Sequence, residues 1–364
     1  MQHARLRAVL ALALVVPAVA VSVAQAAAPR QVNSSVVLRT TDDAGTCAAA
    51  PTAAKVGGKT CPTFRLHYSA PAKRPTALVV VFHGHGHNGQ QYVGQLAGLA
   101  KRYGVLAVAM QTAQLKAGMP SYRGPFDSVD EEARDAAAAI AWARAKYRTG
   151  NRTYLLGVSM GGSGLAYFLD AATRDTAGDA DATWVQRVRP LPLAGMVDAE
   201  GIGNLSETWL EATYADAASA AEIELETGGT PVTAPDAYRA RSLALLSPTQ
   251  YRATGLPVVA VVHDLDDGLV PYNQTWEARA AFLAGGITTR MYDVVFKDSC
   301  AQGDQKTLTS YAPVPGAEDQ LCLAGHANEN NSSTPVMRTA FAALGEILGG
   351  ATETNVIVVN PTRP

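Results

Sequence analysis

Short apolar runs rich in valine, leucine and alanine alternate along this chain with longer amphipathic stretches, and this alternation constrains the fold most. Most of the runs have the length of one strand and no polar alternation, which is typical of strands buried on both faces. The expected strands are 63–69, 77–84, 105–110, 152–159, 192–199, 256–264 and 289–296, and the expected helices are 90–104, 128–147, 160–173 and 334–348. A mostly parallel, doubly wound α/β sheet with helices on both faces follows from that order.

Three segments depart from the alternation and give the expected domain plan. Residues 29–60, rich in Ala, Thr and Gly, are expected to form an N-terminal extension made of loop, and residues 61–349 the main domain. Residues 199–250 are polar and helical and lie between two strands. They are expected to form a cap-like insertion over the carboxyl ends of the strands, where open parallel sheets bind ligands. Residues 350–364 are expected to be a C-terminal tail or to add one edge strand.

Residues 1–28 have the pattern of a secretory signal peptide: a short basic start, an apolar core and small residues at the end. The alternative is a membrane anchor, but the apolar run is shorter than the roughly 20 residues that a span needs. No later stretch is long enough to span a membrane. The chain is therefore expected to be secreted, outside the cell or into a periplasm. Its formal net charge is -2 and it has no basic block, so nucleic acid is not an expected partner.

The four cysteines, Cys47, Cys61, Cys300 and Cys322, suit a secreted chain that forms disulfides. Three pairings are possible. The expected one joins sequence neighbours, Cys47 to Cys61 and Cys300 to Cys322, and each bond would contribute about 3 kcal/mol by closing a short loop. No Cys-x-x-Cys motif is present, which disfavours a zinc ribbon or a dithiol redox site.

The sharpest chemical motif is "GVSMGG", Gly157 to Gly162, which fits Gly-x-Ser-x-Gly. An apolar strand precedes it and a helix follows, which is the setting in which a serine nucleophile occupies a tight strand-to-helix turn between small residues. Ser159 is the predicted nucleophile. The alternative is a glycine-rich helix start that packs on the sheet and has no chemical role.

A serine nucleophile needs a base and an acid that orients the base, and on such a turn the acid and then the histidine follow the serine along the chain. Only His263 and His326 come after Ser159. His263 ends a buried strand, so a structural role is expected for it. His326 lies in a loop before the last helix and is the predicted base.

The acid is expected in "HDLDDGLVP", which follows a buried strand and offers Asp264, Asp266 and Asp267. The pattern His-x-x-x-Asp-x-x-Val-Pro resembles the acid loop of α/β-hydrolases, and that resemblance places the acid at Asp267. Asp264 and Asp266 are the alternatives.

The resemblance to secreted α/β-hydrolases extends over about residues 60–349. It is carried by "VFHGHG", "GVSMGG", "HDLDDGLVP" and "AGH". The segment "YRARSLALLSPTQY" followed by "LPVVAVVHDLDDGLVP" is similar to the catalytic domain of prolyl-oligopeptidase-like hydrolases, although the chain has no room for a propeller. The "SMGG" turn resembles cutinases and polyester hydrolases, which lack the insertion at 199–250. Polyhydroxyalkanoate depolymerases and feruloyl esterases share the same general arrangement.

The resemblance implies a serine hydrolase that cleaves carboxylic esters through an acyl-enzyme, with Ser159, His326 and Asp267 as the triad. The oxyanion would be held by the backbone N–H groups of Met160 and His85. No cofactor or metal is expected, the substrate is a small or polymeric ester, and a monomer is expected. A serine peptidase of the prolyl-oligopeptidase-like type and a polyester depolymerase are the alternatives within the fold.

Two further hypotheses come from other classes of protein. His83, His85 and His87 in "HGHGH" have the spacing of ligands at a strand end, which would suit a zinc hydrolase. A binding protein that keeps the fold without catalysis is the other, and the full set of serine, aspartate and histidine disfavours it.

Overall fold

The structure is a computed structural model of the whole chain. It describes residues 31–39, 55–56, 59–60, 63–85, 89–111, 129–149, 151–174, 184, 191–215, 217–265, 267, 269–294, 326 and 334–359. The predicted signal peptide, all four cysteines and their pairing, His87 and Asp266 lie outside these residues.

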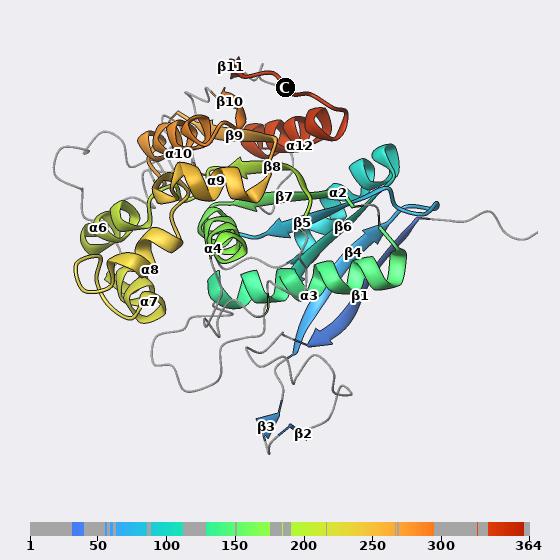
Figure 1. Ribbon diagram of the computed structural model, residues 1–364, viewed down its shortest axis with the longest axis horizontal. Helices are drawn as coiled ribbons and strands as arrows, with labels where there is room; N and C mark the ends of the chain where they lie inside the picture. Colours follow the sequence, from blue (N-terminus) through green and yellow to red (C-terminus); the bar gives the residue numbers. More distant parts are fainter. Residues whose placement is uncertain are drawn as a thin grey trace, which may run out of the picture.

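A nine-stranded, mostly parallel sheet forms the centre of the molecule, in the order β1-β4-β6-β5-β7-β8-β9-β10-β11 (Figure 1). Only β4 pairs antiparallel with its two neighbours, and the other pairs are parallel. The strands are β1 Val32–Arg39, β4 Thr63–Ala70, β5 Ala77–Phe82, β6 Val105–Gln111, β7 Thr153–Val158, β8 Leu193–Ala199, β9 Val258–Asp264, β10 Thr288–Val294 and β11 Asn355–Val359. Two short strands, β2 Lys55–Val56 and β3 Lys59–Thr60, pair only with each other. All seven predicted strands are therefore present.

Helices cover both faces of the sheet, because each central strand has apolar side chains on both faces. On β5, Val79 and Val81 pack with α2 Gly89–Tyr103 and α12 Pro335–Leu348. The alternate side chains, such as Val80 and Phe82, face the opposite core. The helices of that second layer are α3 Val129–Tyr147, α4 Gly161–Thr173, α9 Pro248–Thr254 and α10 Tyr272–Ala284.

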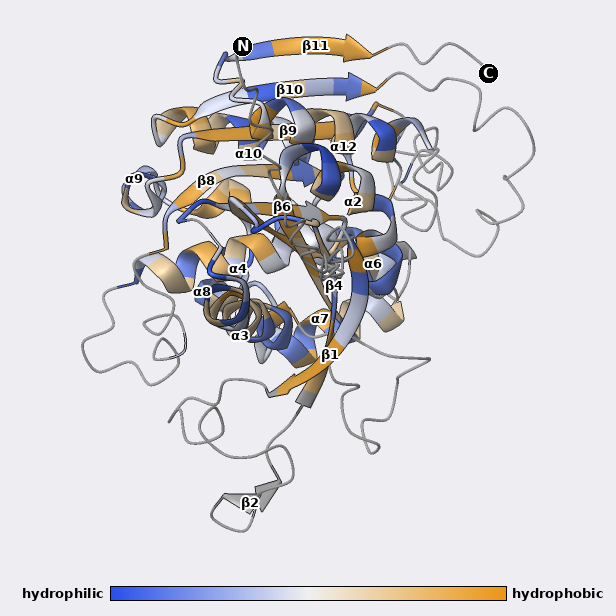
Figure 2. Cartoon of the chain, turned by 90° about the vertical axis from the view of Figure 1, so that its right-hand side faces the viewer, coloured by the Kyte–Doolittle hydropathy of each residue, from blue (hydrophilic) through white to orange (hydrophobic). Residues whose placement is uncertain are grey.

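The sheet extends beyond the expected main domain at both edges. The expectation of loop throughout 29–60 is wrong for residues 32–39, which form β1 and pair with β4. It is also wrong for the short strands β2 and β3. Strand β1 lies at the edge of the sheet and carries the polar run Asn33, Ser34 and Ser35, none of which is buried. It therefore lacks the apolar pattern of the central strands. At the other edge, residues 355–359 form β11 beside β10, which was one of the two expectations for this segment (Figure 2).

The segment between β8 and β9 is helical, as predicted. It contains α6 Leu205–Ala215, α7 Ala217–Thr227, α8 Pro235–Ala240, a 3-10 turn at Leu243–Leu245 and α9. Figure 1 shows α6, α7 and α8 grouped on the side toward which the arrows of β5 and β8 point. The insertion thus lies at the carboxyl ends of the strands, where ligands bind in open parallel sheets.

Among the described residues, no helix combines sufficient length with sufficient hydropathy to cross a bilayer.

Candidate active site

The turn between β7 and α4 holds Ser159 in a strained backbone conformation. Its φ is 55°, in the left-handed region that residues other than glycine rarely adopt. Two backbone hydrogen bonds maintain the turn: Ser159 N–H donates to Ala199 O at 3.0 Å, and Gly162 N–H donates to Ser159 O at 2.8 Å. A non-glycine residue in this conformation is held by its surroundings, and such strain is concentrated at functional sites.

The glycines of the motif are needed because backbones approach closely there. A Cβ at Gly161 would overlap the carbonyl oxygen of Phe82, at the end of β5. A Cβ at Gly157 would overlap the side chain of Leu165 on α4. Small residues therefore let α4 begin directly against the sheet, and this is the physical reason for the Gly-x-Ser-x-Gly pattern.

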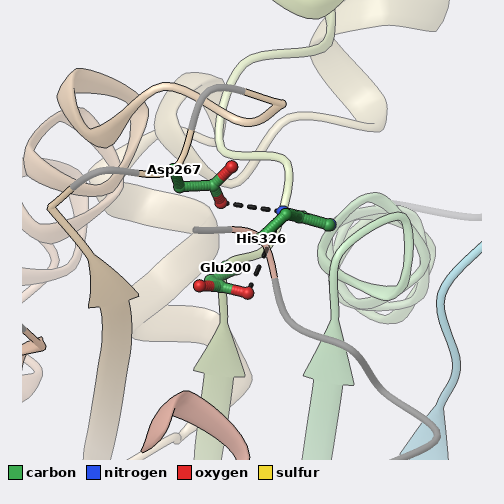
Figure 3. A group of neighbouring side chains, drawn as sticks. All are labelled: Glu200, Asp267 and His326. Carbon is green, nitrogen blue, oxygen red and sulfur yellow. Dashed lines mark hydrogen bonds and ion pairs between the residues drawn. The ribbon is translucent and has the colours of Figure 1, made fainter. Parts of the chain in front are cut away.

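Ser159, His326 and Asp267, which the sequence predicts as a triad, are in contact in the structure. His326 Nε2 lies 2.9 Å from Ser159 Oγ. His326 Nδ1 lies 2.8 Å from Asp267 Oδ2, as Figure 3 shows. An ionised carboxylate only accepts hydrogen bonds, so Nδ1 carries the proton and Nε2 is free to accept from the serine hydroxyl. The arrangement can therefore take a proton from Ser159.

Asp267 is buried, and four donors surround its carboxylate. Oδ1 accepts from the backbone N–H groups of Leu269 at 2.8 Å and Val270 at 3.0 Å, while Oδ2 faces His326 and His263. Burial alone would raise the pKa of Asp267, but the charge of His326 and the hydrogen bonds from His263 and His326 outweigh it and hold the pKa well below its usual range. The carboxylate is therefore ionised. Asp264, an alternative acid, ends β9 and accepts from the N–H of Asp267 through its backbone carbonyl.

His263 is fully buried and contacts the acid directly, a relationship that the sequence did not reveal. Its Nε2 lies 2.8 Å from Val270 O and 3.3 Å from Asp267 Oδ2, and its Nδ1 lies 2.6 Å from Thr275 Oγ1. Both oxygens near Nε2 are acceptors, so this nitrogen carries a proton. Desolvation lowers the pKa of His263, but Asp267 and the carbonyl of Val270 outweigh it and raise the pKa.

The loop after β5 is anchored through its main chain. The N–H of His83 donates to Glu132 Oε1 on α3 at 2.7 Å, and both residues are fully buried. The N–H of Gly84 donates to the hydroxyl of Tyr92 at a longer 3.4 Å. His85 follows and is exposed. Met160, the other predicted oxyanion donor, directly follows Ser159 and occupies the N-cap position of α4.

Two of the histidines considered as zinc ligands, His83 and His85, have separate partners. His83 Nδ1 lies 3.0 Å from Gly84 O, whereas His85 Nε2 lies 3.5 Å from Glu222 Oε2 on α7 of the insertion. Within the described part of the chain, the group that could face one cation is instead Glu200, Asp267 and His326. Its histidine nitrogen, Nδ1, already carries the proton shared with Asp267.

Glu200 is the site residue that the sequence analysis missed. It directly follows β8, is fully buried, and places Oε2 3.9 Å from His326 Nδ1 (Figure 3). The available signal was an acidic residue at the carboxyl end of a buried strand. On α6 of the insertion, burial first, and then the charges of Glu207 and Asp267, raise the pKa of Glu211 to about 7.

Comparisons with known proteins agree with this architecture. No protein-family model matches the chain, and no curated protein matches its sequence. Among solved structures, esterase B from Lactobacillus Rhamnosis has a TM-score of 0.54 and 12% identity, covering 87% of this chain and 85% of its own. Carboxyl esterase 2 from the fungus Tuber melanosporum has a TM-score of 0.52 and 13% identity, with 88% of both chains covered. A mutant of the esterase rPPE has a TM-score of 0.52 and 14% identity, covering 88% and 82%. This chain therefore has the α/β-hydrolase fold, as its motifs predicted.

Proposed function

We propose that this protein is a secreted serine hydrolase that cleaves carboxylic esters through an acyl-enzyme. The observation that carries the proposal is the continuous hydrogen-bonded path from Ser159 Oγ through His326 to Asp267, with distances of 2.9 Å and 2.8 Å. Secretion is supported by the signal-peptide pattern at residues 1–28.

In the first half-reaction, Ser159 Oγ attacks the ester carbonyl carbon and its proton moves to His326 Nε2. The carbonyl oxygen becomes an oxyanion, which the N–H groups of Met160 and His85 are proposed to bind. The tetrahedral intermediate then collapses, the C–O bond to the alcohol breaks, and the alcohol leaves with the proton from Nε2. Water repeats these steps on the acyl-enzyme and releases the carboxylic acid.

Ester substrates are preferred to peptides in this proposal because the three structural neighbours described above, each with a TM-score above 0.5, are esterases by their own descriptions. A small-molecule ester is the simplest substrate, and a polyester is a larger one that the same chemistry would cleave. The insertion between β8 and β9 lies where it would contact the acyl or alcohol group.

The test measures hydrolysis of p-nitrophenyl esters of graded acyl length beside an aminoacyl anilide, with wild type and Ser159→Ala. Wild type should turn over at least one ester, and Ser159→Ala should lose about 10³-fold or more in kcat/KM. A serine-directed phosphonate should inactivate wild type and label Ser159, while a chelator should have no effect. Anilide turnover without ester turnover would favour the peptidase, and full activity of Ser159→Ala would overturn the serine mechanism.

A further inference from the structure

Two carboxylates, not one, face the proton-bearing nitrogen of His326. Asp267 Oδ2 lies 2.8 Å from Nδ1, and Glu200 Oε2 lies 3.9 Å from the same atom. Ligand atoms of the three residues all lie within 4.8 Å of one another, and Figure 3 shows the imidazole beside both acids. At 3.9 Å the contact of Glu200 is electrostatic, because it is too long for a hydrogen bond.

A strained backbone turn holds Glu200 beside His326. Its φ is 49°, so it shares with Ser159 the left-handed conformation that disfavours residues other than glycine. The N–H of Glu200 donates to Val262 O on β9 at 2.8 Å, while its neighbour Ala199 accepts from the N–H of Ser159. The turn is therefore held between the nucleophile strand and the acid strand. Strain retained at such a place is a reason to look for a role of the side chain.

The proposed reaction gives the carboxylate of Glu200 a role, because a positive charge forms on His326 during proton transfer. Two negative charges this close repel each other unless a positive charge lies beside them. The imidazolium formed when His326 takes the proton of Ser159 places such a positive charge beside both acids. An interaction that strengthens in the transition state accelerates the reaction, whereas one of equal strength in both states does not.

We propose that Glu200 is a positioning residue that stabilises the imidazolium form of His326 alongside Asp267, and that it moves to accept a hydrogen bond from His326 Nδ1–H when Asp267 is removed. No proton moves to Glu200 in the normal cycle, since the imidazolium returns its proton to the leaving alcohol. This inference rests on the proposed serine hydrolase function and adds a second acid to its triad.

The first experiment compares Glu200→Gln with wild type across pH, using the ester that wild type cleaves best. Glutamine keeps the size of the side chain and removes its charge. We expect kcat to fall about tenfold with little change in KM, because the lost interaction forms in the transition state. The acid limb of the pH profile should move to lower pH, since a negative charge near His326 favours its protonated, inactive form. Glu200→Asp should recover part of the loss.

The second experiment is a double-mutant cycle with Asp267→Ala. If Glu200 replaces the missing acid, Asp267→Ala alone should be about 100-fold more active than the double variant Asp267→Ala, Glu200→Gln. Removing the charge of Glu200 would then cost more activity in the Asp267→Ala background than in wild type. Additive losses, or an unchanged pH profile in Glu200→Gln, would overturn the proposal.

Two controls separate this result from misfolding and from failure of the serine mechanism. Glu200→Gly relieves the strained φ, so it should fold at least as well as Glu200→Gln in thermal unfolding, yet lose the same activity. If Glu200→Gly recovered wild-type activity, the carboxylate would have no role. Ser159→Ala should abolish the reaction. If it does not, the proposed serine mechanism is wrong, and the role of Glu200 falls with it. If it does, the double-mutant cycle tests Glu200 alone.

Discussion

His263 Nε2 lies 3.3 Å from Asp267 Oδ2, so two imidazoles meet at one carboxylate oxygen. His326, the proposed base, contacts that oxygen through Nδ1, whereas His263 is fully buried and its other ring nitrogen contacts Thr275. His263 thereby supplies one of the donors that keep Asp267 ionised.

Replacing His263 with leucine should lower kcat/KM by about 10- to 100-fold, because a misplaced supporting group disturbs the geometry of the acid. The melting temperature should also fall, since the hydroxyl of Thr275 and the carbonyl of Val270 lose their partner. His263→Gln, which can still donate from its amide, should retain more of both. Equal activity of the leucine and glutamine variants would mean that the contact with Asp267 is incidental.

Gly161→Ala tests the packing of the nucleophile turn. The added methyl group would meet the backbone of Phe82, which cannot move without shifting β5, so we expect a loss of about 2 kcal/mol or more in the free energy of unfolding. Ester hydrolysis should become undetectable, as the turn that presents Ser159 is displaced.

Gly94→Ala is the matched control for that variant. Gly94 lies within α2, and a Cβ there would meet no atom within 4 Å. The same substitution should therefore stabilise the helix by about 0.5 to 1 kcal/mol and leave hydrolysis unchanged. Urea unfolding of both variants, beside their kcat/KM values, separates a packing effect from a general effect of alanine.

Glu132→Ala probes the anchor of the loop after β5. The substitution leaves the buried N–H of His83 without the carboxylate that accepts from it, and this should cost about 1 to 3 kcal/mol of stability. If the loop supplies an oxyanion donor, kcat should also fall by about 10-fold or more, because the donor is misplaced. A variant with reduced stability but unaltered kcat would place the oxyanion donors elsewhere.

Asp198 should make stability depend on pH. Burial, opposed only in part by the charge of His263, raises the pKa of Asp198 to about 7. Between pH 4 and 7 the unfolded chain has released this proton while the folded protein keeps it, so the contribution of Asp198 falls as pH rises, by on the order of 4 kcal/mol.

Asp198→Asn removes that titration. The variant should gain stability relative to wild type as pH rises from 4 to 8, and the gain should level off above pH 7. Urea unfolding across this range measures the difference. A constant difference between the two proteins at all pH values would contradict the raised pKa.

The central strands and covering helices could be predicted from the sequence because burial on both faces leaves continuous apolar runs, as in β5 and β9. The edge strand β1 could not, because half of its side chains face away from the core. Ser159 could be predicted as the nucleophile from the glycines around it, and the resemblance of the acid loop pointed to Asp267. The position of Glu200 and the contact of His263 with Asp267 could not be predicted. Both depend on which strand ends become neighbours, and a local sequence pattern does not reveal the order of strands in the sheet.

The register of the parallel strands determines how far apart the side chains of the candidate active site lie. Ser159 and Glu200 follow the adjacent strands β7 and β8, whose ladder pairs Val158 with Ala199. A slip of one residue would move a group by about 3.3 Å and turn its side chain to the opposite face. Helices α6 and α7 of the insertion lie outside that ladder and carry exposed side chains such as Leu210, Tyr214 and Leu225, whereas α9 packs in the core. Engineers seeking new substrate preferences should therefore diversify the exposed residues of α6 and α7 and leave the strands and α9 untouched.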